Sequence, residues 1–242
     1  MTGHKVVVVD DEVAIRRLLS SALERGGYSV VAVGTAREAL NALEIDKPAA
    51  VLLDLGLPDR EGLELIQPIV KSGAALVVIS AREATQEKVA ALDLGADDYV
   101  TKPFDTDEVM ARLRRALRQH HGNEGQATVQ IDDLEIDLLA RRIRRAGEDV
   151  HLTPKEYAVL AELAKHPGRV LTHSQLLRAV WGPAHERDVE YLRVVARELR
   201  KKIEADASRP KIIKTEPAIG YRLADPAPFE RAAGESGHGE GG

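Results

Sequence analysis

The chain contains no cysteine, and this absence excludes three kinds of chemistry. None of its 242 residues can form a disulfide, a thiolate zinc site or a cysteine nucleophile. No apolar run approaches the roughly 18 residues of a membrane-spanning helix. The amino-terminal segment lacks the apolar region and the small-residue cleavage site of a signal peptide. We therefore expect a cytoplasmic protein without a membrane partner.

Net charge is also low, but the two halves of the chain differ in sign. The whole chain has a formal charge of −5. Residues 1–118 contain 15 lysine and arginine residues against 19 aspartate and glutamate residues, whereas residues 128–223 contain 18 against 15. An acidic half followed by a mildly basic half fits a regulatory module joined to a nucleic-acid-binding module. The length suits two ordinary domains.

The first half alternates strand and helix patterns five times. Its strand candidates are short and nearly continuous in aliphatic residues, as expected for parallel strands covered on both faces. Five such units predict an α/β domain of the flavodoxin-like (βα)5 type, with a doubly wound parallel sheet and right-handed crossovers. The strands are expected at Val6–Val9, Ser29–Val33, Ala50–Leu53, Leu76–Ile79 and Asp98–Val100.

Helix positions follow from apolar spacing and from capping boxes. A threonine or aspartate followed three positions later by glutamate or glutamine predicts the start of a helix. The boxes are Thr35 with Glu38, Asp105 with Glu108, Thr153 with Glu156 and Thr172 with Gln175. The buried faces are expected to be Ile15, Leu18, Leu19, Ala22 and Leu23 in the first helix, and Val109, Leu113 and Leu117 in the fifth.

The second half has a different pattern. Periodicity is lost over residues 119–127, which we interpret as a linker between a domain at 1–118 and a domain at 128–225. Residues 226–242 are rich in glycine, glutamate and proline and are expected to be a disordered tail. The second domain is expected to contain a strand meander at 129–152, helices at 154–165, 173–181 and 188–204, and a hairpin formed by 211–215 and 221–223.

Five polar residues are expected to meet at one edge of the parallel sheet. They are Asp10 and Asp11 after the first strand, Asp54 after the third, Ser80 at the end of the fourth and Lys102 after the fifth. Ligands bind beyond the carboxyl ends of such strands. Three crowded carboxylates would raise each other's pKa unless a cation joined them, and a hard divalent ion such as Mg²⁺ suits oxygen ligands.

This set of residues suits phosphoryl transfer. Asp54 has the chemistry of a nucleophile, and Mg²⁺ together with Lys102 would neutralise the phosphoryl oxygens. The alternative is that these are ordinary surface charges with helix-capping duties. That alternative accounts for any one residue, but it does not account for four separate segments that supply complementary groups.

Residues 188–204 predict an amphipathic helix with a basic side. Its buried stripe would be Val189, Leu192, Ala196, Leu199 and Ile203. Arginine reads guanine edges in the major groove of DNA. The alternative is a solvated cationic face, paired internally with Glu190, Glu198 and Glu204. The basic residues of this helix are Arg193, Arg197, Arg200, Lys201 and Lys202.

Four segments of the first half, VVVVDDE, LLDLGLPDREG, VVISARE and GADDYVTKPF, closely resemble the signature segments of response-regulator receiver domains. The resemblance implies that a sensor histidine kinase transfers a phosphoryl group to Asp54, that Ser80 and Lys102 hold it, and that Tyr99 turns inward as a switch. It also implies a cis peptide bond before Pro103. The Mg²⁺ ligands that it implies are Asp10, Asp11, Asp54 and the backbone carbonyl of Gly56.

The same resemblance implies a homodimer that forms upon phosphorylation. The interface would be the face made by the fourth helix, fifth strand and fifth helix. The alternative is that the charged residues of this face are solvated and contribute little. The residues implied in the interface are Lys88, Asp97, Asp98, Glu108, Arg112 and Arg118.

The second half resembles the winged helix-turn-helix output domain of the OmpR/PhoB family in VHLTPKEYAVLAELAKHPGRVLTHSQLLRAVWG, YLRVVARELRKKIE and IGYRL. The resemblance implies an α+β domain whose third helix enters the major groove. One departure is the stretch Glu216–Ile219, where relatives have arginine and glycine, so the wing tip is less basic. By resemblance, Arg193, Arg197 and Arg200 contact bases, Lys201, Lys202, Lys214 and Thr215 contact phosphates, and Tyr221 and Arg222 lie in the wing.

Within this family, the segments DLGLPD, WGPAHE and TEPAIGYRL are similar to regulators of a potassium-transport operon. That similarity implies a KdpD-like sensor kinase as partner and activation of potassium-uptake genes. The loop Gly182–Arg187 lies where relatives meet RNA polymerase, although a plain connection explains it equally well.

The sequence therefore predicts a transcription regulator rather than an enzyme, with slow self-dephosphorylation as its only turnover. Phosphorylation of Asp54 would favour a dimer that binds paired DNA half-sites arranged as direct repeats. Two alternatives remain open. One is an aspartyl-phosphate phosphotransferase acting on a small molecule, although Gly56 stands where a second acid would protonate the leaving group. The other is a DNA-binding regulator with a vestigial receiver.

Overall fold

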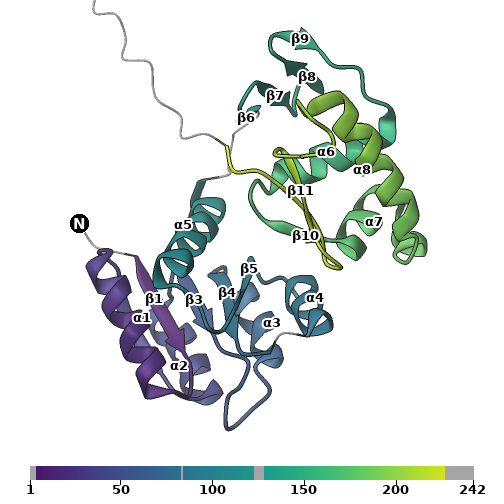
Figure 1. Ribbon diagram of the computed structural model, residues 1–242. Helices are drawn as coiled ribbons and strands as arrows, with labels where there is room; N and C mark the ends of the chain where they lie inside the picture. Colours follow the sequence, from purple (N-terminus) through teal and green to yellow (C-terminus); the bar gives the residue numbers. More distant parts are fainter. Residues whose placement is uncertain (1–3, 83, 123–127, 227–242) are drawn as a thin grey trace, which may run out of the picture.

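The computed structural model describes residues 4–82, 84–122 and 128–226, and only the backbone of residues 121 and 122. The first domain is a parallel sheet in the order β2-β1-β3-β4-β5 (Figure 1). This confirms the predicted flavodoxin-like α/β arrangement. The strands are β1 (Lys5–Val9), β2 (Ser29–Val33), β3 (Ala50–Leu53), β4 (Ala75–Ser80) and β5 (Asp98–Thr101); the helices are α1 (Val13–Arg25), α2 (Ala36–Asp46), α3 (Leu63–Lys71), α4 (Thr85–Asp93) and α5 (Thr106–Gly122).

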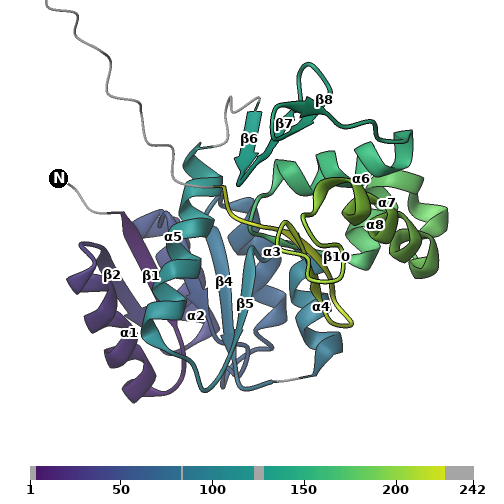
Figure 2. The same ribbon diagram turned by 45° about the horizontal axis from the view of Figure 1, so that its top comes forward.

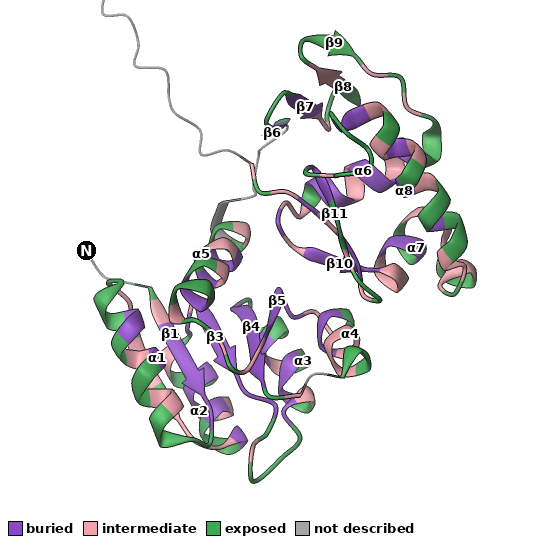
Figure 3. Cartoon of the chain, viewed as in Figure 1, coloured by how far each residue is buried: buried purple, intermediate pink, exposed green. Residues whose placement is uncertain are grey.

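Successive residues of each strand contribute to two separate cores, one on each face of the sheet. In β1, Val7 and Val9 pack with α2, α3 and α4, whereas Val6 and Val8 pack with α1 and α5. Both cores are buried, as the purple strands in Figure 3 show. The continuous apolar runs in the sequence therefore have a direct physical cause, because each strand has helices on both sides.

The second domain has two antiparallel sheets around three helices, which confirms the predicted winged-helix architecture. The sheets have the orders β6-β7-β8-β9 and β10-β12-β11. The three helices and the strands share one core. The elements are β6 (Thr128–Ile131), β7 (Leu134–Asp137), β8 (Arg142–Arg145), β9 (Glu148–Asp149), α6 (Pro154–Lys165), β10 (Val170–Thr172), α7 (His173–Trp181), the 3-10 turn η1 (Pro183–His185), α8 (Val189–Ile203), β11 (Ile213–Glu216) and β12 (Gly220–Leu223).

Two of the four predicted capping boxes are complete. The side chains of Thr153 and Thr172 cap α6 and α7, and the third residue of each helix returns the hydrogen bond. Thr35 accepts a hydrogen bond from the backbone of Glu38, but the Glu38 carboxylate binds the Gly34 amide instead. The box predicted at Asp105 is also incomplete, because the Asp105 carboxylate accepts from the Asp107 amide and the Glu108 carboxylate binds Arg112. In both cases another donor competes for the carboxylate.

Two predictions about helix faces and ends were wrong. Leu18 was predicted to be buried but is 46% exposed, because it lies at the border of the face that α1 turns toward the sheet. Helix α5 continues to Gly122, past the predicted linker start at residue 119. The side chain of Gln119 binds the Pro167 carbonyl, and that of His120 binds the Gly73 carbonyl, so both residues are held by tertiary contacts. Residues 123–127 of the predicted linker and the tail beyond Pro226 lie outside the described residues.

No helix within the described ranges combines the length and the apolar character needed to cross a membrane.

Candidate functional site

Three segments of the receiver-like domain meet at the carboxyl edge of its sheet. Asp10 follows β1, Asp54 follows β3 and Lys102 follows β5. The Lys102 ammonium donates to Asp10 Oδ2 at 2.8 Å and to Asp54 Oδ2 at 3.2 Å. Asp10 and Asp54 are only 2% and 6% exposed. The predicted convergence of these three side chains is therefore present in the fold.

The environment of this edge favours a buried positive charge beside the two carboxylates. Burial raises the pKa of Asp10, and the hydrogen bond from Lys102 offsets only part of that effect. For Lys102, burial alone would lower the pKa. The hydrogen bond to Asp10 and the charges of Asp54 and Asp10 outweigh burial, so the pKa of Lys102 lies above its ordinary value. Lys102 is therefore charged at neutral pH.

The loop after β1 supplies oxygen atoms that suit a hard cation. Carboxylate oxygens of Asp10, Asp11 and Glu12 lie within 4.8 Å of one another. The Arg16 guanidinium donates to the carbonyls of Asp10 and Asp11 and so fixes the loop. An all-oxygen donor set fits Mg²⁺. Glu12 was not among the predicted site residues, although its position directly after Asp10-Asp11 was a signal, and its carboxylate lies 3.5 Å from Lys102.

Two glycines shape the backbone around Asp54. A Cβ atom at Gly56 would lie 3.4 Å from Asp54 Oδ2, so this residue borders the carboxylate. A Cβ atom at Gly62 would lie 2.5 Å from the Leu55 Cα and 2.9 Å from the Asp54 carbonyl oxygen, closer than packed atoms approach. The loop therefore requires glycine at position 62, which sequence reasoning did not identify.

Ser80 and Tyr99 lie beside the acidic edge. Ser80 is 1% exposed, and its hydroxyl accepts a hydrogen bond from the Arg82 amide at 3.2 Å. Tyr99 is 9% exposed and its hydroxyl donates to the Arg82 carbonyl at 2.8 Å, so the ring points inward. Burial raises the pKa of the Tyr99 hydroxyl. The peptide bond between Lys102 and Pro103 is cis, as the resemblance implied.

Charged residues on α4, β5 and α5 pair with one another within the chain. Arg112 binds Asp98 at 2.8 Å and Glu108 at 2.6 Å. Arg115, which was not predicted, also binds Asp98. The Lys88 ammonium lies 5.7 Å from the centre of the Tyr99 ring, and Arg118 is exposed. Their predicted role in a dimer interface stays a prediction.

Asp97, also predicted on that face, is 5% exposed and makes its contacts inside the chain. It accepts hydrogen bonds from the Leu76 amide at 2.8 Å and from the His120 ring at 2.9 Å. These bonds tie the residue before β5 to β4 and to the end of α5.

The His120 contact predicts a pH dependence of stability. The hydrogen bond to Asp97 raises the pKa of His120 above 6.5, against the opposing effect of burial. A raised pKa in the folded state stabilises the protein below the ordinary pKa, and this contribution is lost as pH rises through the raised value. We expect His120→Asn to lower the free energy of unfolding by about 0.5–1 kcal/mol near pH 5.5 and by much less near pH 9. Urea denaturation of both proteins at the two pH values measures this, and an equal difference at both would contradict it.

The outward face of α8 carries arginines together with one exposed aromatic and one exposed aliphatic side chain. Arg193 and Arg197 have 57% and 70% of their side chains exposed, and each forms an ion pair with a glutamate of the same helix. On the same helix, Tyr191 is 61% exposed and Val194 is 50% exposed. Sequence reasoning assigned no role to these two residues, although they fall outside the buried stripe. Lys201, Lys214 and Thr215 are also exposed.

Other predicted DNA contacts are engaged inside the second domain. Arg200 donates to the Ile213 carbonyl and to the Thr215 hydroxyl, and it lies over the ring of Tyr221, which is 5% exposed. Lys202 binds the buried Glu156 carboxylate at 2.6 Å. Arg222 pairs with Glu216 in the wing hairpin. These residues position α8 and the wing, and their predicted DNA contacts remain untested.

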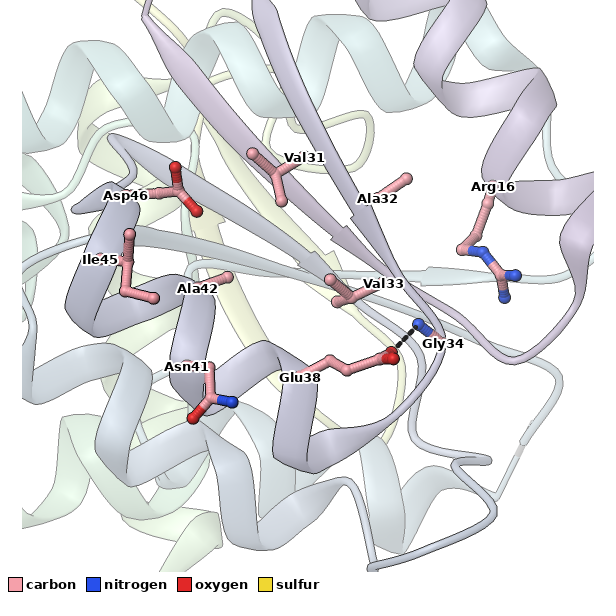
Figure 4. Close-up of a pocket in the computed structure, with 10 residues that line it drawn as sticks. All are labelled: Arg16, Val31, Ala32, Val33, Gly34, Glu38, Asn41, Ala42, Ile45 and Asp46. Carbon is pink, nitrogen blue, oxygen red and sulfur yellow. Dashed lines mark hydrogen bonds between the residues drawn. The ribbon is translucent and has the colours of Figure 1, made fainter.

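A hollow beside the edge strand β2 is separate from the acidic edge. Figure 4 shows Arg16, Glu38 and Asn41 at its border, with Glu38 accepting the hydrogen bond from the Gly34 amide. Its wall is formed largely by β2 and α2, and none of the predicted phosphorylation or metal residues lines it.

Comparisons with known proteins agree with both halves of the chain. Residues 6–114 match the response regulator receiver domain family, and residues 147–223 match the family of transcriptional regulatory protein C-terminal domains. The KDP operon transcriptional regulatory protein KdpE of Escherichia coli K12 is 46% identical over 220 residues, which cover 90% of this chain and 98% of that protein. KdpE of Mycobacterium tuberculosis H37Rv is 42% identical over 221 residues, with the same coverage.

Among solved structures, the response regulator DrrB of Thermotoga maritima, an OmpR/PhoB homologue, is 31% identical, with a TM-score of 0.47, over 92% of this chain and 99% of that one. A receiver domain followed by a DNA-binding domain makes a sensor kinase and DNA the partners of the chain. The chain belongs to the OmpR/PhoB-type two-component response regulators that control transcription, and among them it is KdpE-like.

Proposed function

We propose that Asp54 accepts the phosphoryl group and that its phosphorylation converts the chain into a DNA-binding dimer. The observation that carries this proposal is the contact of the Lys102 ammonium with both Asp10 and Asp54. A buried cation between a candidate nucleophile and a candidate metal ligand is the arrangement that a phosphoryl group with several negative oxygens needs.

The chemistry follows from the residues at this edge. A bond forms between phosphorus and an Asp54 carboxylate oxygen as the phosphorus–nitrogen bond of a kinase phosphohistidine breaks, and the imidazole retains the electron pair. Lys102 neutralises a phosphoryl oxygen, and the Ser80 hydroxyl donates to another. Asp10, Asp11 and Asp54, with the Gly56 carbonyl and with Glu12 nearby, would hold Mg²⁺, which supplies further positive charge to the phosphoryl oxygens when bound.

The switch is a shift between two populations of the receiver. A phosphoryl group on Asp54 would draw Ser80 toward it and stabilise Tyr99 in the inward position, which the ring already occupies in this structure. The adjoining surface of α4, β5 and α5 carries Lys88, Asp98, Glu108, Arg112 and Arg118, whose opposite charges would pair with those of a second copy. We propose that two phosphorylated chains associate through this face.

The DNA-contacting surface is proposed to be the outward face of α8. Arg193 and Arg197 would reach base edges in the major groove, and Val194 and Tyr191 lie beside them. Lys201, Lys214 and Thr215 are exposed where they would contact phosphates. Arg200, Lys202 and Tyr221 are proposed to hold this surface in place. They would contact bases or phosphates only after releasing the partners that they bind within the domain.

The target is proposed to be the promoter of a potassium-transport operon, with a KdpD-like kinase upstream. Support comes from the two KdpE relatives, one of which is described as a KDP operon regulator. The segment Gly182–Arg187, which includes η1, is proposed to contact RNA polymerase. It is exposed at Pro183, Ala184 and Arg187.

A substitution on α8 tests the division of labour between the domains. We expect Arg197→Ala to weaken binding to a potassium-operon promoter fragment by about 10- to 100-fold, because one base-edge contact contributes about 1–3 kcal/mol. Phosphorylation of Asp54, followed by Phos-tag electrophoresis, should be unchanged. The matched control is Arg114→Ala, which removes an exposed arginine from α5. Loss of phosphorylation in Arg197→Ala, or equal DNA binding by the two variants, would contradict the proposal.

A further inference from the structure

The receiver and the winged-helix domain are joined by hydrogen bonds at the end of α4. Asp93 is the last residue of α4, and its carboxylate accepts hydrogen bonds from the hydroxyls of Thr172 and Ser174, the latter at 2.8 Å. The Gln175 side chain donates to the Leu92 carbonyl at 2.9 Å. These three partners form the first turn of α7 and its cap, so the receiver holds the helix that precedes the DNA-facing helix.

The position of Asp93 is unfavourable for its own helix and favourable for α7. A carboxylate at the carboxyl end of a helix meets the negative end of the helix dipole, whereas one at the amino end meets the positive end. Asp93 lies at the carboxyl end of α4 and at the amino end of α7. Its charge therefore contributes to the contact between the domains rather than to the stability of the receiver alone.

A second group of contacts lies next to the first. The Arg169 guanidinium, 16% exposed, donates to the Ala96 carbonyl at 3.1 Å and lies 3.4 Å from Asp97 Oδ1. Arg169 precedes β10, and Ala96 and Asp97 precede β5. Figures 1 and 2 show β10 on the side of the receiver where α4 and β5 lie. The two groups of contacts thus fasten one edge of the wing sheet to the receiver.

The attached wing shares a pocket with the proposed dimer face. Asp98, Tyr99 and Arg112 line it from the receiver, and Glu216 and Arg222 line it from the wing. Arg222 is turned toward Glu216 and this pocket, with 22% of its side chain exposed. A second receiver cannot occupy the face that the wing covers, and Arg222 cannot leave the pocket for DNA while the wing stays there.

We infer that the chain has a closed state in which Asp93 latches the first turn of α7, so that the dimer face and the wing screen each other. The inference rests on the proposed function, because it takes the screened face of α4, β5 and α5 to be the dimer interface. Phosphorylation would then act against the latch, because a dimer through α4, β5 and α5 forms only after the wing leaves. The latch sets the fraction of chains that are open without a phosphoryl group.

Asp93→Asn tests the latch without any phosphodonor. It removes the charge, keeps the shape, and should weaken both hydroxyl contacts. Because a hydrogen bond to a charged group is lost, we expect the open fraction, and with it promoter-fragment affinity, to rise about tenfold. The matched control is Glu24→Gln, an exposed acid in the last turn of α1, away from the second domain. Distances between spin labels at Ile45→Cys and Leu139→Cys report opening, since the chain has no cysteine of its own and both sites are over 80% exposed.

The expected result is a longer or broader distance distribution and tighter DNA binding for Asp93→Asn, with the control like the parent. An unchanged distribution, or opening without a gain in affinity, would overturn the inference. A reverse test joins the two thiols of the Asp93→Cys, Ser174→Cys double variant with a short bis-maleimide cross-linker, which adds one thiol at each end. After phosphorylation, the cross-linked protein should neither dimerise nor gain affinity for DNA. Dimerisation and a gain in DNA affinity like those of the parent protein would also overturn the inference. Since the first test uses no phosphodonor, failure of Asp54 phosphorylation leaves its outcome unaffected.

Discussion

Asp54→Ala is expected to bind a potassium-operon promoter fragment with the same affinity whether or not a small-molecule phosphodonor and Mg²⁺ are present. The affinity of the parent protein for this fragment should increase on the order of 100-fold when both are added, because dimerisation makes binding of the second half-site intramolecular. The reason lies at the acidic edge, where Lys102 holds the Asp54 carboxylate beside Asp10. Alanine removes the attacking oxygen and leaves the cation without a phosphoryl group to bind. Fluorescence anisotropy of labelled DNA measures both states.

The control for this experiment is Glu44→Ala, which removes an exposed carboxylate from α2 in the same domain. It should respond to the phosphodonor as the parent does. If Asp54→Ala tightened as much as the parent, the phosphoryl group would act elsewhere and the proposed switch would be refuted.

Gly220→Ala is expected to have the largest effect on stability. A Cβ atom at this position would lie 1.9 Å from the Leu171 carbonyl oxygen and 2.8 Å from the Thr172 Cα, both backbone atoms that cannot move aside alone. Gly220 pairs with Thr172 across β12 and β10. We expect the free energy of unfolding of the winged-helix domain to fall by about 3 kcal/mol or more, at the upper end of overpacking penalties. Loss of DNA binding should follow.

Gly147→Ala is the comparison. Gly147 has a φ of 83°, but no atom lies within 4 Å of the position that an added methyl group would take, so the cost of the substitution is backbone strain of about 1–2 kcal/mol. Chemical denaturation followed by the fluorescence of the single tryptophan, Trp181, reports on this domain. Equal destabilisation by both substitutions would show that β10 yields to the added methyl group.

Local patterns predicted much of the fold because their physical causes are local. The valines of β1 are apolar throughout since helices cover both faces of the sheet. Thr153 and Thr172 mark the starts of α6 and α7. Each threonine hydroxyl, together with the acid or amide side chain three residues later, binds backbone amides that lack a partner at the start of a helix. The three-residue strand β10 was missed, since Thr172 ends it and caps the next helix at once.

The acidic edge was predictable for a related reason. Parallel strands place their carboxyl ends together, so Asp10, Asp54 and Lys102 had to be neighbours once the topology was known. Their partners were less accessible to sequence reasoning. Glu12 lies in the same loop, but only the folded loop shows that its carboxylate reaches Lys102.

Contacts between the domains could not be read from the sequence. Asp93 and Thr172 are 79 residues apart, and neither carries a pattern that points to the other. Helical periodicity near Gln119 was also hidden, because polar side chains there find partners such as the Pro167 carbonyl in the second domain. Such contacts depend on how two finished domains meet.

The central claim is that carboxylates from separate segments gather so that one aspartate accepts phosphate. Peptide mapping by mass spectrometry, after incubation with a small-molecule phosphodonor with and without Mg²⁺, tests it most directly. We predict one phosphoryl group, located at Asp54, formed only with Mg²⁺ and absent from Asp54→Ala. A phosphoryl group on another residue of the parent protein, or one that forms equally well without Mg²⁺, would contradict the claim.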